Sequence, residues 1–131
     1  MMANPAAVNL SPKHPSGDPD PAEAVLDLVH LSRQTFGDHA LETELLALFE
    51  RQASQLSRRL EAPRSMGDAS ARIDLAHMLK GSARSVGAFA VAAAAEAYET
   101  ALRAGDAREA ALCGRLLAEI EAVRGAIADI L

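Results

Sequence analysis

The chain has 131 residues and a formal net charge of −5; half of its residues are apolar, but only 3% are aromatic. This length fits one domain, and apolar content made mainly of alanine, leucine, valine and isoleucine favours packed helices over a β-sandwich. Lysine and arginine are scattered, so no basic stripe or aromatic platform indicates nucleic-acid binding. The single cysteine, Cys113, excludes an internal disulfide and a cysteine-rich zinc site, and it favours a reducing, cytoplasmic compartment.

The first residues differ from the rest in composition. Residues 1–21 hold five of the six prolines and contain no apolar core of the kind found in signal peptides. We therefore expect a flexible segment over residues 1–20 and one helical domain over residues 21–131. No apolar run approaches the roughly 20 residues of a membrane span, so no membrane contact is expected.

Two helices are expected in the first half of the domain. Apolar residues recur at three- and four-residue spacing over 22–34, with Asp20 as the candidate N-cap. Asp38 then caps a second helix, which ends before a loop at 63–67. The expected apolar positions of this second helix are Leu41, Leu45, Leu48, Phe49, Leu56 and Leu60.

Three further helices are expected in the second half. One covers about 68–85 and ends at Gly87, the next covers 88–104, and the last follows a D-x-x-E capping box that begins at Asp106. No strand pattern competes with them. Long helices with short connections predict an all-α fold: an antiparallel up-down four-helix bundle with a short additional N-terminal helix.

The third of these helices carries an unusual polar face. Its core face, drawn at about 100° per residue, holds Leu75, Leu79, Ala83 and Val86. His77, Lys80, Gly81 and Arg84 fall together on the opposite face, so His77 is not a core histidine. Because glycine inside a helix costs about 0.5–1 kcal/mol relative to alanine, Gly81 indicates a need for access beside His77.

This face suits an anion carried on the imidazole ring. A neutral imidazole is a nucleophile at cellular pH, and Lys80 and Arg84 would place positive charges beside a phosphoryl group on His77. Taken singly, a surface histidine or a surface lysine is usually only solvated. The inference therefore rests on the combination of the four residues.

The stretch AHMLKGSARSVGA (76–88) resembles the signature of histidine-containing phosphotransfer (HPt) domains, H-x-L-K-G-S/A-x(4)-G-A, at every position. The resemblance covers about 26–131 and implies a four-helix bundle. It implies that His77 is the phosphoacceptor, that Lys80 stabilises the phosphoryl group and that Gly81 leaves room for the partner. It also implies a glutamine or glutamate that hydrogen-bonds Nδ1 of the ring; Glu99 has the corresponding spacing, and Glu96 is the neighbouring candidate.

The function implied by this resemblance is that of a carrier in a multistep His-Asp phosphorelay. His77 would take a phosphoryl group from the phospho-aspartate of a receiver domain and pass it to another receiver. The receiver would supply Mg²⁺, and the chain itself is expected to bind no cofactor. Because the sequence has no P-loop, kinase-type glycine loop or metal-binding carboxylate cluster, we expect a monomeric phosphocarrier and not an enzyme that uses ATP. A hybrid histidine kinase is a further candidate partner.

Two alternative functions stay open at this point. One is a helical module that binds and regulates a receiver or a histidine kinase without phosphotransfer. The other is a phosphoacceptor domain akin to the N-terminal domain of chemotaxis-type kinases, fed by a kinase in trans. A docked partner would need an apolar patch near His77, where Ile73 and Met78 flank the polar face; Ile73 could instead pack under the first helix.

The remaining histidines and the cysteine have simpler interpretations. His14, His30 and His39 show no metal-ligand spacing, so we expect them in the lead-in, on helix surfaces or in loops. Cys113 lies on the apolar stripe of the last helix and is expected to be a small core residue.

Overall fold

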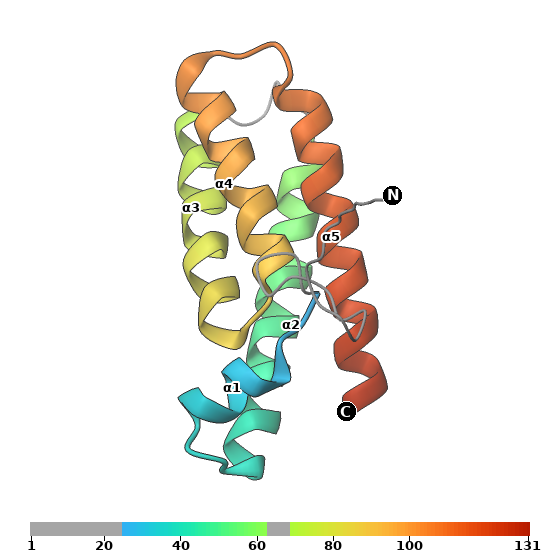
Figure 1. Cartoon of the computed structure of the whole chain (residues 1–131). Coiled ribbons are helices and arrows are strands. Elements are labelled where there is room, and N and C mark those ends of the chain that lie inside the picture. The colour runs from blue at the N-terminus through green and yellow to red at the C-terminus, as the bar shows by residue number, and fades with distance from the viewer. Residues whose placement is uncertain (1–24, 63–68) are drawn as a thin grey trace, which may run out of the picture.

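The computed structural model describes residues 25–62 and 69–131, and these fold into five helices with no strand among them. Four long helices lie side by side, and a short one lies at the end of the bundle where the second helix begins (Figure 1). The all-α class predicted from composition and periodicity is confirmed. The helices are α1 (Leu28–Gln34), α2 (His39–Glu61), α3 (Ala69–Val86), α4 (Phe89–Ala104) and α5 (Glu109–Ile130).

Helix α1 starts later than the sequence pattern predicted. It begins at Leu28, because the carboxylate of Asp27 caps it by accepting the N–H of His30 at 3.0 Å. Residues 25–27 are not helical, so the expected start at residue 22 is wrong. The cap expected at Asp20 and the segment 1–20 lie outside the described residues.

Helix α2 begins as predicted, with Asp38 as the N-cap that accepts the N–H of Leu41 at 3.1 Å. Its buried face differs from the expected one, since Leu41 and Leu48 are exposed and Leu46 is buried. Leu48 directly precedes the buried Phe49 and is turned about 100° from it around the helix axis, so it points to the side of the core face. The buried residues of α2 are Leu46, Phe49, Ala53, Leu56, Ser57 and Leu60.

The connection between α3 and α4 is only two residues long. Helix α3 ends at Val86, and Gly87 terminates it as predicted, with a left-handed φ of 86°. A Cβ on Gly87 would lie 2.6 Å from the carbonyl oxygen of Asp27, and the Gly87 carbonyl accepts the N–H of Asp27 at 2.9 Å. The glycine therefore permits both the tight turn and the close approach of the segment before α1.

The start of α5 differs from the expected capping box. The N-cap position is Arg108 and not Asp106, because residues 106–108 form a turn before the helix. The Asp106 carboxylate accepts the N–H of Arg108 at 2.8 Å within that turn. Gly105 ends α4 in the left-handed conformation, with φ of 64°, as expected of a C′ glycine.

The core includes one arginine among its aliphatic side chains. Arg72 on α3 is only 3% exposed and donates to the carbonyl oxygens of Leu60 and Ala62 at the end of α2, at 3.2 and 2.8 Å. It also donates to the hydroxyl of the buried Tyr98 at 2.9 Å. Arg72 thus ties the last turn of α2 to α3 and α4. Cys113 is buried, as expected of a small core residue.

Within residues 25–62 and 69–131, no helix is both long enough and apolar enough to cross a membrane.

Candidate functional site

Helix α3 presents the polar face that its periodicity predicted. The expected core face is buried, and it consists of Leu75, Leu79, Ala83 and Val86. His77, Gly81 and Arg84 are exposed on the other side, with 63% of the His77 side chain accessible. Ala76 and Leu79 beside His77 are buried, so the histidine stands on a backbone that the core holds in place.

The carboxylate that contacts His77 belongs to Glu99 on α4. Oε2 of Glu99 lies 3.1 Å from Nδ1 of His77, and Oε1 lies 3.2 Å from Nζ of Lys80. Although it is charged, Glu99 is only 6% exposed. The short turn at Gly87 brings α4 back along α3, and this return is what places Glu99 beside a histidine 22 residues earlier.

Arg103 is a site residue that the sequence pattern of α3 does not predict. It follows Glu99 by one turn of α4, and its Nε and Nη2 donate to Oε2 of Glu99 at 3.1 and 2.8 Å. The i,i+4 spacing of Glu99 and Arg103 is the sequence signal that could have found it. Glu99 therefore has three partners, and it forms salt bridges with two of them, Lys80 and Arg103.

These partners keep Glu99 ionised. Its pKa is lowered from 4.5 to about 2, first by the hydrogen bonds from Arg103 and then by those from Lys80 and His77, although burial opposes the shift. The ionised carboxylate favours the tautomer of His77 in which Nδ1 carries the proton. In that tautomer Nε2 keeps its lone pair.

The low pKa of Glu99 predicts a pH-dependent contribution to stability. A carboxyl whose folded pKa lies below its unfolded pKa stabilises the fold fully above about 4.5, and this contribution is lost as pH falls towards about 2. We expect Glu99→Gln to lower the thermal midpoint at pH 7, and the gap to the unmodified protein to narrow between pH 5 and pH 2. Thermal melts of both proteins across this range measure it; a gap that does not change with pH contradicts the prediction.

Lys80 and Gly81 both follow His77 by about one turn of α3, but they differ in exposure. The Lys80 side chain is 17% exposed and is held against Glu99, whereas Gly81 is exposed. A Cβ on Gly81 would meet nothing within 4 Å. The space beside Gly81 is therefore open, and packing within the bundle does not require a glycine there.

Arg84 and Glu96 form a pair of their own at the surface. Nη2 of Arg84 donates to Oε1 of Glu96 at 2.9 Å, and both side chains are 55% exposed. Glu96 thus binds Arg84 and not His77. The Arg84 charge expected beside a phosphoryl group is matched by this carboxylate instead.

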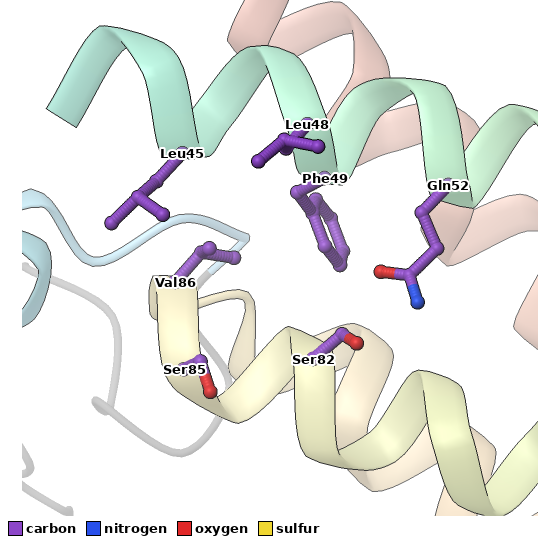
Figure 2. A pocket seen from close by; sticks show the side chains of 7 residues that line it. All are labelled: Leu45, Leu48, Phe49, Gln52, Ser82, Ser85 and Val86. Atoms are coloured by element: carbon purple, nitrogen blue, oxygen red, sulfur yellow. The ribbon is translucent and has the colours of Figure 1, made fainter. Parts of the chain in front are cut away.

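A cleft of about 410 Å³ lies between α2 and α3 (Figure 2). Side chains of the two helices point toward one another across it, and Ser82, which directly follows Gly81, lines it. Leu48 contributes an exposed apolar side chain to its α2 side. The lining residues are Leu45, Leu48, Phe49, Gln52, Ser82, Ser85 and Val86.

The two apolar residues expected to flank the site separate in the structure. Met78 is 48% exposed beside His77 in the sequence, whereas Ile73 is half-buried and packs against the core. A docked partner could therefore contact Met78 and the rim of the cleft, whereas Ile73 is much less accessible to it.

The described residues hold no group of three or more histidine, cysteine, aspartate or glutamate side chains that could bind a metal ion. His39 is exposed, as expected, with its ring beside Glu42. His30 is half-buried and meets the ring of Phe89 edge-on, with centroids 5.0 Å apart, so it is less exposed than expected. His14 lies outside the described residues.

Comparison with protein families gives a match to most of the helical bundle. A family model described as Hpt domain matches residues 44–126, which is more than half of the chain. The chain belongs to the Hpt domain family. The match begins within α2 and ends within α5, so it includes α3 and α4 with His77 and Glu99.

A solved structure is similar to this Hpt domain over most of its length. It is the crystal structure of histidine-containing phosphotransfer protein B (HptB) from Pseudomonas aeruginosa PAO1, with 27% sequence identity and a TM-score of 0.72. The similarity covers 80% of this chain and 92% of that chain. A search of the curated proteins gives no match. Family and structure together assign a histidine phosphotransfer role in phosphorelay signalling, in which Hpt domains act as phosphocarriers.

Proposed function

We propose that the chain is the histidine phosphotransfer component of a multistep His-Asp phosphorelay, with His77 as the phosphoacceptor. The observation that carries this proposal is the pairing of an exposed imidazole with a buried, ionised carboxylate at Nδ1, 3.1 Å away. A receiver domain with a phospho-aspartate is the donor, and a second receiver is the acceptor. His39 is the other exposed histidine of residues 25–62 and 69–131, and its carboxylate partner, Glu42, is 18% exposed instead of buried.

In the proposed reaction Nε2 of His77 attacks phosphorus in line with the bond to the receiver's aspartate. Phosphoryl transfer depends mainly on positioning and on stabilising charge. Glu99 holds the ring and its tautomer, and Lys80 is the group that offers positive charge to the phosphoryl oxygens. The receiver contributes Mg²⁺ and most of the remaining charge stabilisation.

Docking of the receiver is proposed over the open surface at Gly81. Met78 and the rim of the cleft between α2 and α3 offer apolar area beside it. The short connections at residues 87–88 and 105–108 support an up-down order of the four long helices, which places this docking surface along the flank of the bundle. We propose that the protein acts as a monomer in the cytoplasm, where receiver domains would reach it.

The direct test is transfer from a panel of phosphorylated receiver domains. We expect the chain to gain a label that is stable in base and labile in acid, as for phosphohistidine, and to gain none from ATP alone. A chemotaxis-type kinase added in trans serves as the comparison donor. Labelling by that kinase, with none from any receiver, would replace the relay assignment with the kinase-fed one.

Gly81→Ala is expected to raise the stability of the fold and to slow phosphoryl transfer. Alanine is favoured over glycine inside a helix, and nothing lies within 4 Å of the added Cβ, so we expect a gain of about 0.5–1 kcal/mol in unfolding free energy. The methyl group faces the proposed docking surface, so transfer should slow about tenfold or more. Chemical denaturation and the initial rate of labelling measure the two effects.

Gly125→Ala is the matched control for this change. Gly125 is also an exposed helical glycine, on α5, and a Cβ there meets nothing within 4 Å. It should give the same gain in stability and an unchanged transfer rate. Equal transfer rates for the two alanine variants would remove the proposed role of Gly81.

A further inference from the structure

Lys80 and Arg103 hold opposite oxygens of the Glu99 carboxylate. Lys80 donates to Oε1 at 3.2 Å, while Arg103 donates two N–H groups to Oε2 at 3.1 and 2.8 Å. Nδ1 of His77 also contacts Oε2, at 3.1 Å. One carboxylate thus binds the proposed phosphoacceptor and two cations at the same time.

This arrangement gives Lys80 two competing partners. Before transfer its ammonium is bound to Glu99, which lies on the Nδ1 side of the ring. The phosphoryl group would be carried on Nε2, the other ring nitrogen. To reach the phosphoryl oxygens, Lys80 has to release or share Oε1. A carboxylate that is 6% exposed loses stabilisation when a cation leaves it, so this exchange needs a second cation that stays.

We propose that Arg103 is a positioning residue that holds Glu99 against Nδ1 of His77 while Lys80 moves from Glu99 to the phosphoryl group. This inference rests on the proposed function. In the step, the Nε2 lone pair forms the N–P bond as the P–O bond to the receiver's aspartate breaks, and that electron pair leaves with the aspartate carboxylate. The proton stays on Nδ1, so the ring gains a positive charge that the Glu99 anion stabilises.

The position of Arg103 suits this task. It lies on the same helix as Glu99, one turn away, so the pair needs no motion of α3 to persist. Its side chain is 59% exposed and reaches Glu99 from the solvent side, whereas Lys80 is largely covered. Two N–H groups of a planar guanidinium fix the direction of Oε2, which the point charge of a lysine would do less well.

The test compares Arg103→Gln, Arg103→Lys and the unmodified protein. Initial rates of phosphoryl transfer from a phosphorylated receiver are measured over a range of receiver concentrations, and the ¹⁵N shifts of the His77 ring report its tautomer. Arg103→Gln should lower the maximal rate about tenfold, the scale typical of losing an outer partner of a functional group. The half-saturating receiver concentration should stay the same, the Nδ1–H tautomer should lose population, and Arg103→Lys should recover part of both effects.

Arg108→Gln is the control, because Arg108 also binds a carboxylate on this chain but lies in the turn before α5, 79% exposed. It should match the unmodified protein in rate and tautomer. The proposal for Arg103 is overturned if Arg103→Gln changes neither the maximal transfer rate nor the tautomer populations of the His77 ring. The proposed function fails separately, if the unmodified chain takes no label from any receiver; the tautomer measurement still tests whether Arg103 positions Glu99.

Discussion

His77→Gln is expected to abolish phosphoryl acceptance while the fold is retained. The amide of glutamine offers no nucleophilic nitrogen in place of the imidazole, so no label should appear on the chain. Because the His77 side chain is 63% exposed, the change in unfolding free energy should stay within about 0.5 kcal/mol. Labelling by a phosphorylated receiver and chemical denaturation measure the two outcomes.

His39→Gln is the matched control for that variant. His39 is an exposed helical histidine whose Nδ1 lies 3.3 Å from a carboxylate, Oε1 of Glu42, so it shares the local contact but not the buried setting. It should take label normally. If His77→Gln also takes label, His77 is not the acceptor; if it takes none but still regulates a receiver fully, the phosphorylation-independent module is the better description.

Arg72→Ala is expected to produce the largest loss of stability of the changes considered. It removes the donor for two carbonyl oxygens at the end of α2 and for the hydroxyl of Tyr98, and it leaves a cavity in the core. Burial raises the pKa of the Tyr98 hydroxyl, so that group stays neutral and needs a partner. We therefore expect Arg72→Ala to lower the free energy of unfolding by about 3 kcal/mol, which corresponds to a thermal midpoint lower by about 10 °C.

Arg58→Ala gives the comparison for Arg72. Arg58 is on α2 near the same helix end, but it is exposed and donates only to the side chain of Ser54 among the described contacts. Its removal should change stability by less than about 0.5 kcal/mol. Similar costs for the two variants would show that the buried contacts of Arg72 contribute little.

The face of α3 could be predicted because helical periodicity is a local property. The spacing of Leu75, Leu79 and Ala83 fixes where the core lies, and His77 and Gly81 then have to be on the other side. Which glutamate contacts His77, Glu96 or Glu99, was harder to predict from the sequence. It depends on how α4 lies against α3 after the turn at residues 87–88, which periodicity within one helix does not determine.

Features that depend on distant contacts escaped the sequence pattern. Arg72 looks like an ordinary helix residue until the end of α2 and Tyr98 on α4 close around it. The start of α1 depends on Asp27, which both caps the helix and bonds to Gly87, 60 residues later. Leu48 fits the three-four spacing of α2, but it lies on the side where the cleft leaves it exposed.

In the proposed relay, His77 takes a phosphoryl group from one receiver and gives it to another. A pulse and chase with two receivers tests both transfers, when the label is then mapped to a peptide under basic conditions. We expect label from the first receiver to appear on the peptide that contains His77 and to move to the second receiver when that receiver is added. Label that never reaches the chain, or that maps to another residue, would contradict the proposed relay.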